Sequence, residues 1–443
     1  MDRAVLVSAP GTGHGKTLVA TALCAALTRT GRTVQAYKVG PDYIDASLYR
    51  SLCGRPAYNV DLWLDGAEGA RRHVARTSAG AQAAVFEGMM GLFDGDDDGE
   101  TSSARLAMLL DLPVVLVLDV WTCSQTAAAM ALGCLRYEPR LRVAGVVLNR
   151  VGGERHERAV RRACEGVGLR VLAAVPNDAA YAAGERRLGL DPREVEGRAA
   201  AVAALAERLA GELPLDELFP PQARGAGEAP RTPQPAPRVK VAVAQDEAFW
   251  FTYPETLDAL RDAGAEIVPF SPLHDRALPA GVRGLWIGGG YPELHGRALE
   301  GNAALRREIA RALGAGMPAY AECGGMMYLA EGIKTAEGYY EMAGVLSGST
   351  SMAHPRLHIG YRRARSLGRT PLDPEGTELR GYEYHYASNH VHEPPAYAYE
   401  GGGRGGARRE NVLAAFLHRH FLTGDPAIAR FVEACAGWEA APA

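Results

Sequence analysis

The stretch AVLVSAPGTGHGKTLVATALCAALTRT, residues 4–30, decides the fold of the N-terminal half of this 443-residue chain. Its apolar start, residues 4–9, predicts a buried strand, and residues 18–30 predict an apolar helix. The glycines between them let backbone N–H groups converge on phosphate oxygens, and the start of the helix adds its dipole. The stretch therefore predicts a phosphate-binding loop, although Pro10 stands where the usual pattern has its first glycine.

The side chains of this loop predict that it binds ATP together with Mg²⁺. Lys16 would bridge the terminal phosphates, and the Thr17 hydroxyl would ligate Mg²⁺. A glycine turn without a ligand is the alternative, and a GKT triplet between a strand and a helix argues against it. The residues expected to hold the nucleotide are Gly11, Thr12, Gly13, Gly15, Lys16 and Thr17.

Apolar runs separated by helical stretches recur along the rest of the chain. In the N-terminal half they predict parallel strands with helical crossovers, which is a doubly wound sheet. The C-terminal half begins in the same style and then becomes richer in Tyr, His and Gly, so mixed or antiparallel strands are expected there. The fold class is therefore α/β, in two domains. The predicted strands span residues 4–9, 33–39, 83–88, 113–120, 143–151, 171–176, 239–245, 265–270, 284–290 and 317–323.

The two domains are separated by residues 220–237, which read PPQARGAGEAPRTPQPAP. This segment has almost no bulky apolar residue and cannot bury a core, so it predicts an extended linker. The boundaries that follow are 1–219 for the ATP-binding domain and 238–443 for the second domain. Two domains of about 200 residues each suit a chain of this length.

Composition and charge narrow the class of protein. The net charge is −4 and no run of Lys or Arg forms a basic patch, so no nucleic-acid partner is expected. We see neither an apolar stretch that would span a membrane nor a signal peptide at the N-terminus. The seven cysteines are odd in number and none forms a CxxC pair, which favours reduced thiols in a cytoplasmic protein.

Acidic residues follow two of the predicted strands, where open α/β sheets bind their ligands. Asp42 and Glu87 are our candidates for the Mg²⁺ shell, because carboxylates beside a triphosphate need a cation between them. Asp45 and Asp94 lie further along the same loops and would face the acceptor substrate. Asn149, at the end of another strand, would read the adenine edge, and a helix cap or turn is an equally good interpretation.

A second reactive constellation lies in the C-terminal half. Residues 317–329, MPAYAECGGMMYL, predict a strand, a tight turn and a helix, with Cys323 exposed at the turn as a nucleophile. The Gly324 N–H group is the expected oxyanion donor, and Gly289 in the loop 288–294 is a candidate for the second donor. The base must be a histidine brought in by folding, and the short apolar segment 413–422 offers His418 and His420.

Taken together and in order, these motifs resemble the cobyrinic acid a,c-diamide synthase family. The resemblance implies a dethiobiotin-synthetase-like ATP domain fused to a class I glutamine amidotransferase domain. It also implies glutamine and a corrinoid tetrapyrrole carboxylate as substrates, with the a and c side chains amidated in cobalamin synthesis. The motifs are the phosphate-binding loop, GPDYID (40–45), EGMMGLFDG (87–95), GGGYPEL (288–294), AECGGMMYL (321–329), GYEYHY (381–386) and FLHRHF (416–421).

The resemblance also assigns residues. It makes Cys323 the nucleophile and His418 the activating histidine. The usual class I pattern is H-x-E, and here His420 occupies the position of the glutamate, which leaves the group that orients His418 unidentified; Glu383 is a weak candidate. A macrocyclic substrate would favour an aromatic surface, to which Tyr43 would contribute.

Several alternatives remain open at this point. The same motifs fit the same reaction on hydrogenobyrinic acid or on a nickel sirohydrochlorin, and they also fit the reaction of cobyric acid synthase. The oligomeric state is open as well, and a homodimer is one possibility. From a different class of protein, the N-terminal half alone would suit an ATPase switch that binds partners. Cys323 at a strand-to-helix turn has no purpose in such a switch, so glutaminase activity would separate the two classes.

Overall fold

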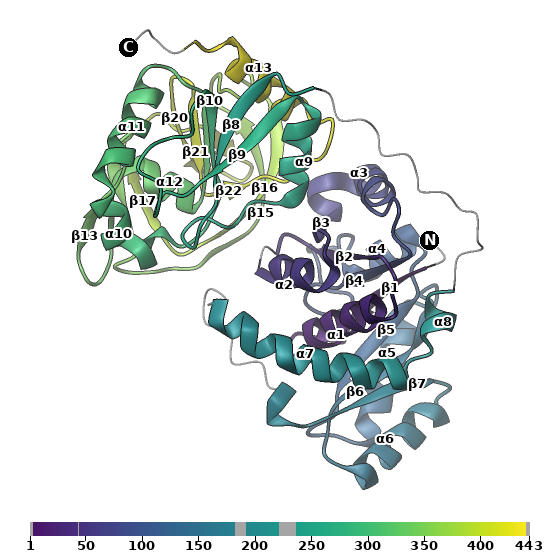
Figure 1. Ribbon diagram of the computed structural model, residues 1–443. Helices are drawn as coiled ribbons and strands as arrows, with labels where there is room; N and C mark the ends of the chain where they lie inside the picture. The colour runs from purple at the N-terminus through teal and green to yellow at the C-terminus, as the bar shows by residue number, and fades with distance from the viewer. Residues whose placement is uncertain (1–2, 43, 182–191, 221–235, 440–443) are drawn as a thin grey trace. The chain divides into compact units, whose positions relative to one another are not determined.

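The computed structural model describes residues 3–42, 44–181, 192–220 and 236–439. The chain divides into two compact units, Met1–Arg231 and Thr232–Ala443, which are described here one at a time (Figure 1). Among the described residues, no helix combines the length and the apolar character needed to cross a bilayer.

The N-terminal unit is built on a seven-stranded sheet in the order β3-β2-β4-β1-β5-β6-β7. All neighbouring strands pair in parallel, with β1 at the centre between β4 and β5. The predicted strands are all present, and the sequence interpretation missed only the short edge strand β3. The strands are β1 (Ala4–Ser8), β2 (Val34–Val39), β3 (Tyr58–Val60), β4 (Ala83–Glu87), β5 (Val114–Asp119), β6 (Val143–Val151) and β7 (Val171–Pro176).

Helices cover both faces of this sheet. One apolar core joins the sheet to α1, α7 and α8, and a second core on the other face joins it to α3, α4, α5 and α6. Two cores on opposite faces confirm the doubly wound architecture that the spacing of the apolar runs predicts. The helices are α1 (Lys16–Arg29), α2 (Ile44–Cys53), α3 (Leu62–Thr77), α4 (Ser103–Leu110), α5 (Gln125–Tyr137), α6 (Glu154–Gly166), η1 (Ala179–Tyr181), α7 (Pro192–Glu212) and α8 (Leu215–Leu218).

The C-terminal unit contains a six-stranded sheet in the order β20-β21-β11-β10-β8-β9. Its strands are parallel except for the edge strand β20, which pairs antiparallel with β21. The helices are α9 (Pro254–Asp262), η2 (Pro292–His295), α10 (Gly296–Gly301), α11 (Ala303–Gly314), α12 (Gly324–Leu329) and α13 (Pro426–Gly437). The strands of this sheet are β8 (Val239–Ala244), β9 (Ala265–Phe270), β10 (Val282–Ile287), β11 (Ala319–Glu322), β20 (Ala407–Arg409) and β21 (Val412–Ala415).

Two smaller, largely antiparallel sheets complete this unit, as the Tyr- and His-rich second half of the domain predicts. In the larger one, strand β22 pairs with β16 and places His418 opposite Tyr382. The strands are β12 (Ala330–Lys334), β13 (Tyr339–Glu341), β14 (Leu346–Ser351), β15 (His358–Ser366), β16 (Glu378–His385), β17 (Ser388–Val391), β18 (Tyr397–Tyr399), β19 (Arg404–Gly405) and β22 (Leu417–His418).

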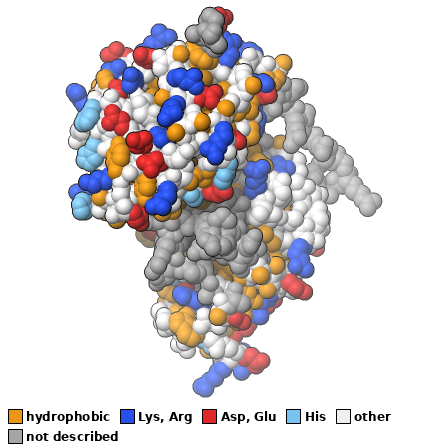
Figure 2. Space-filling model, turned by 60° about the vertical axis from the view of Figure 1, so that its left-hand side comes forward, with side chains coloured by type: hydrophobic (Ala, Val, Ile, Leu, Met, Phe, Trp, Pro, Cys, Tyr) orange, Lys and Arg blue, Asp and Glu red, His pale blue; other side chains and the backbone are white. Residues whose placement is uncertain are grey.

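On the face drawn in Figure 2, Lys and Arg side chains are interspersed with Asp and Glu, and apolar side chains are scattered between them. This mixture of both signs is typical of a protein surface that stays in solution. It agrees with the small net charge of the whole chain, −4.

Candidate active sites

The glycine loop lies between β1 and α1, as the sequence predicts. Gly15 caps α1 with a left-handed backbone, at φ 94°. A Cβ atom at this position would lie 2.2 Å from Nδ2 of Asn149, so no other residue fits without movement. Asn149, at the end of β6, donates a hydrogen bond from Nδ2 to the carbonyl oxygen of His14 at 2.9 Å. Asn149 therefore supports the loop, and its predicted contact with adenine stays a prediction.

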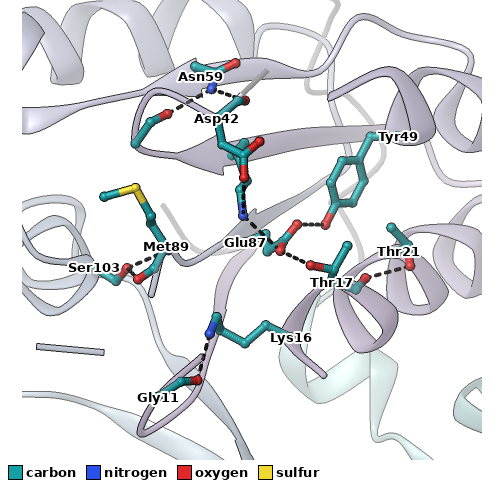
Figure 3. Close-up of polar contacts among 12 residues, drawn as sticks. Gly11, Lys16, Thr17, Thr21, Asp42, Tyr49, Asn59, Glu87, Met89 and Ser103 are labelled. Atoms are coloured by element: carbon teal, nitrogen blue, oxygen red, sulfur yellow. Dashed lines mark hydrogen bonds and ion pairs between the residues drawn. The ribbon is translucent and has the colours of Figure 1, made fainter. Parts of the chain in front are cut away.

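Figure 3 shows the polar contacts of two side chains at the glycine loop, Lys16 and Thr17. The Lys16 ammonium donates a hydrogen bond to the carbonyl oxygen of Gly11 at 2.9 Å and so folds back over the loop. The Thr17 hydroxyl donates to Oε1 of Glu87 at 2.5 Å. The end of β4 is thereby joined to the first turn of α1.

Glu87 is a buried carboxylate, only 1% exposed, at the end of β4. Besides the Thr17 hydroxyl, it accepts hydrogen bonds from Lys38 Nζ at 2.9 Å and from the Tyr49 hydroxyl at 2.6 Å. Lys38 Nζ also lies 3.7 Å from Oδ2 of Asp42. An ionised carboxylate is costly to bury unless a cation compensates it, and Lys38 does so here.

The contacts of Lys38 and Tyr49 with Glu87 were not predicted from the sequence. A signal was present for Lys38, because a lysine within the apolar run 33–39 must find a partner when the strand is buried. No comparable signal existed for Tyr49, which is brought to Glu87 by helix α2.

The oxygen atoms at this site fit Mg²⁺. The Thr17 hydroxyl and the Glu87 carboxylate are in contact, the Asp42 carboxylate is joined to them through Lys38, and all are hard donors of the kind that Mg²⁺ prefers. In the part of the chain that the structure describes, no three His, Cys, Asp or Glu side chains form a metal cluster. Protein ligands that are few in number suit Mg²⁺, which usually keeps water and phosphate oxygens in its shell.

The predicted substrate-facing residues are only partly described. Oδ2 of Asp94 accepts a hydrogen bond from the Gly91 N–H group at 2.7 Å, so this carboxylate closes its own turn. Asp94 is nevertheless an exposed residue. Tyr43 and the side chain of Asp45 lie outside the described residues.

In the C-terminal unit, Cys323 stands at a sharp turn between β11 and α12. Its backbone has φ 51° and ψ −106°, a strained conformation for a residue with a side chain. The turn is anchored by a hydrogen bond from the Cys323 N–H group to the Ala415 carbonyl oxygen at 2.8 Å. A Cβ atom on Gly324 would lie 2.8 Å from the Gly290 carbonyl oxygen, so only glycine fits after Cys323 without movement of the backbone. Strain of this kind is typical of functional sites.

His418 lies beside this turn, and Glu322 lies beside His418. Nδ1 of His418 is 3.0 Å from Oε1 of Glu322, and both side chains are nearly inaccessible to solvent. Burial disfavours the charged ring, but the Glu322 carboxylate and the Cys323 sulfur favour it more strongly. Together they raise the pKa of His418 to about 10. His418 is therefore held between a carboxylate and the cysteine, and both favour the charged form of its ring.

The suggestion that Glu383 orients His418 is wrong. Oε2 of Glu383 pairs with Nε of Arg362 at 2.8 Å, and the carboxylate at His418 is that of Glu322. A signal for Glu322 was available, because it is an acidic residue in an otherwise apolar strand, directly before the predicted nucleophile.

His420 belongs to a separate buried pair. Its Nε2 atom is hydrogen-bonded to Oε1 of Glu255, which lies in the first turn of α9. The ring of His420 also contacts the ring of Tyr253 edge to face, with centroids 4.8 Å apart. Of the two candidate histidines, only His418 is joined to the residues around Cys323 by the contacts described here.

The predicted oxyanion donors differ in their environment. The N–H group of Gly289 donates to the Phe251 carbonyl oxygen at 3.0 Å, and Phe251 donates back at 3.1 Å. This two-way bridge engages the Gly289 N–H in the structure, and its role as the second donor stays a prediction. Gly290, the next residue of the loop, is the glycine whose backbone lies against Gly324. Gly324 itself directly follows Cys323 and stays the predicted donor.

The sequence is similar to synthases over nearly its whole length. A cobyrinate a,c-diamide synthase from Syntrophotalea carbinolica is 36% identical, with 98% of each chain aligned. A hydrogenobyrinate a,c-diamide synthase from Thermobifida fusca is 40% identical, with 97% of this chain and 96% of the relative aligned. The chain belongs to the cobyrinate and hydrogenobyrinate a,c-diamide synthase family. A hydrogenobyrinate a,c-diamide synthase from Mesorhizobium japonicum is also 40% identical, over 94% of this chain and 98% of the relative.

Family models divide this similarity between the two units. Residues 5–189 match the CobQ/CobB/MinD/ParA nucleotide binding domain, and residues 240–426 match the CobB/CobQ-like glutamine amidotransferase domain. The first range includes the glycine loop, Lys38 and Glu87. The second includes Cys323 and His418.

Proposed function

We propose that this protein uses ATP and glutamine to amidate the a and c carboxylates of cobyrinate or hydrogenobyrinate in cobalamin biosynthesis. The observation that carries the proposal is the arrangement of Cys323, His418 and Glu322 in the same chain as the glycine loop of Lys16 and Thr17. A glutaminase site in one unit and a nucleotide site in the other are the two half-sites that this reaction needs. The a,c-diamide synthases described above are similar across both units.

In the glutaminase half-reaction, the Cys323 sulfur attacks the carboxamide carbon of glutamine. His418 gives its proton to the departing ammonia, and a thioester remains on the cysteine. The Gly324 N–H group would stabilise the oxyanion of the tetrahedral intermediate. Water, deprotonated by His418, then releases glutamate and restores the thiol.

In the synthetase half-reaction, an oxygen of the substrate carboxylate attacks the γ-phosphorus of ATP, and ADP leaves. Ammonia then attacks the carbon of the acyl phosphate, and phosphate departs with the carboxylate oxygen. Lys16 would stabilise the charge on the transferred phosphoryl group. Mg²⁺, held through Thr17, Glu87 and Asp42, would neutralise the phosphates when bound. Asp45, Asp94 and Tyr43 are proposed to face the tetrapyrrole.

Lys38 has a role in this scheme as well. It is bonded to Glu87 and lies close to Asp42, so it balances the negative charge of both predicted metal ligands. We expect these contacts to rearrange when Mg²⁺ and the triphosphate arrive, since the cation then takes over that balance.

The relatives named for cobyrinate and for hydrogenobyrinate are about equally similar to this chain, so the metal state of the substrate needs an experiment. We propose to incubate the purified protein with ATP, Mg²⁺ and glutamine, and to offer cobyrinate, hydrogenobyrinate, nickel sirohydrochlorin and cobyrinate a,c-diamide in parallel. Mass spectrometry counts the amides added to each.

We expect two amides on cobyrinate, hydrogenobyrinate or both. Amides added only to cobyrinate a,c-diamide would indicate a cobyric acid synthase reaction instead. ATP hydrolysis without glutaminase activity and without any amide product would refute the proposal and favour an ATPase switch. Light scattering of the same sample would test the homodimer that the sequence leaves open.

A further inference from the structure

The base of the proposed glutaminase site needs a group that fixes the orientation of its ring and stabilises its positive charge. In class I amidotransferases this group is usually the glutamate of an H-x-E pattern, as noted for the resemblance above. The corresponding residue here is His420, which is bonded to Glu255 of α9. The chain therefore has a carboxylate at His418 that comes from a different place in the sequence.

That carboxylate is Glu322, the last residue of β11 and the neighbour of Cys323. It is 5% exposed, and its Oε1 atom lies 3.0 Å from Nδ1 of His418. A carboxylate at Nδ1 fixes the ring orientation and leaves Nε2 as the nitrogen that exchanges a proton with Cys323.

The second oxygen of Glu322 is also engaged. Oε2 accepts a hydrogen bond from the Tyr320 hydroxyl at 2.6 Å and another from the Arg419 N–H group at 3.1 Å. Tyr320 lies two residues before Glu322 on β11 and so shares its face of the strand. Arg419 directly follows His418. The Glu322 carboxylate is thus held by Tyr320 from its own strand, β11, and by Arg419 from the segment that contains His418.

We propose that Glu322 is the positioning residue of the glutaminase, taking the part that the glutamate of the H-x-E pattern plays elsewhere. Its carboxylate accepts the Nδ1–H bond of His418 throughout the reaction. When the Cys323 proton moves to Nε2, Glu322 stabilises the imidazolium that results and does not itself take up the proton. The inference rests on the proposed function in one respect only, that glutamine is the substrate of Cys323.

The test is the variant Glu322→Gln, which keeps the shape of the side chain and removes its charge. We expect the glutaminase kcat to fall on the order of 100-fold or more, with KM little changed, because the carboxylate acts on the base and not on glutamine. The alkaline limb of the pH–rate profile should move to lower pH, because His418 without its carboxylate loses its proton more easily.

Two further variants make the result specific. Glu383→Gln is the matched control, since Glu383 is also a buried glutamate of this unit but is paired with Arg362. It should keep the wild-type profile. Glu322→Asp keeps the charge, so its alkaline limb should stay at the wild-type position. Ammonia-dependent amidation, measured on every variant, reports that the protein is folded and that the synthetase half is intact.

The proposal is overturned if Glu322→Gln retains a kcat and an alkaline limb like those of the wild type. If Glu322→Gln does not fold, Glu322→Asp decides alone, because an alkaline limb displaced from the wild-type position despite the retained charge would also overturn it. A wild-type protein without any glutaminase activity would instead refute the proposed function, which keeps the two failures apart.

Discussion

The two candidate sites of this chain are both built at the carboxyl ends of parallel strands, but they are prepared for chemistry in different ways. In the proposed glutaminase site, the protein would supply the groups of the first step itself: Cys323 at its strained turn, His418 as the base and the carboxylate of Glu322. In the nucleotide site, the corresponding charges are bonded to each other, with Lys38 between Glu87 and Asp42.

This difference follows from the chemistry of the two half-reactions. Amide hydrolysis by a thiol needs a nucleophile and a base that are already aligned. The free-energy cost of aligning them is therefore met when the protein folds. Phosphoryl transfer depends on charges that arrive with Mg²⁺ and ATP, so the protein groups there compensate one another until the ligands bind. The comparison predicts that substitutions in the glutaminase site lower only glutamine-dependent amidation. Substitutions in the nucleotide site should lower amidation with either glutamine or ammonia as the nitrogen source.

The largest effect is expected for Cys323→Ala. Glutamine-dependent amidation should fall by at least about 1,000-fold, because no other group can form the thioester. Amidation with ammonium chloride should remain close to the wild-type rate. Both rates can be followed by mass spectrometry of the tetrapyrrole. Loss of the two activities together in a folded variant would contradict the division between the sites.

The histidines provide the next comparison. His418→Ala should lose glutaminase activity almost as completely as the cysteine variant, because nucleophile and base act as a unit. His420→Ala should mainly lose stability, by about 3 kcal/mol in urea unfolding, since the buried carboxylate of Glu255 would lack its partner. If His420→Ala abolishes the glutaminase and His418→Ala does not, the assignment of the base is wrong.

Lys16→Ala tests the nucleotide site. Amidation should fall by about 100-fold or more with either nitrogen source, because the lysine stabilises the transferred phosphoryl group in both cases. Glutaminase activity measured without ATP should change little. A variant that amidates normally with ammonia would show that Lys16 has no part in the phosphoryl transfer.

The smallest and most selective effect is expected at Asp45 and Asp94. Asp94→Asn removes the charge but keeps an oxygen that can accept the Gly91 hydrogen bond, whereas Asp94→Ala removes both. We expect Asp94→Asn and Asp45→Asn to lower amidation or to stop it after one amide, with nucleotide affinity and glutaminase activity little changed.

If Asp94 only closes its turn, Asp94→Asn will give the wild-type ratio of mono- to diamide. Asp94→Ala would then cost about 1 kcal/mol in stability and little in turnover. A large loss of nucleotide affinity in either asparagine variant would instead move these acids to the Mg²⁺ shell.

The features that the sequence predicted well are local ones. The glycine loop and the turn at Cys323 are each formed by contiguous residues, because a strand, a turn with small residues and a helix must follow each other directly. The α/β architecture was predictable for the same reason, since strands buried on both faces read as continuous apolar runs. The edge strand β3 was missed because three residues are too few to show a period.

The features that could not be predicted are contacts between distant parts of the chain. Glu322 and His418 are 96 residues apart, and the position of Glu322 directly before Cys323 does not say which histidine it contacts. The bridge between Gly289 and Phe251, which uses the predicted oxyanion donor, joins two loops that only the folded sheet brings together. Lys38 is intermediate, because its burial was predictable and its partners were not.

The most direct test of the central claim, that the nucleotide site activates the carboxylate independently of the cysteine, is an isotope transfer in Cys323→Ala. The tetrapyrrole carboxylates are labelled with oxygen-18, and the variant is supplied with ATP, Mg²⁺ and ammonium chloride. Phosphorus NMR then shows whether the released phosphate carries the label. The account predicts one labelled phosphate for each amide formed, because the acyl phosphate breaks at its carbon–oxygen bond. Amide formation with unlabelled phosphate would contradict it.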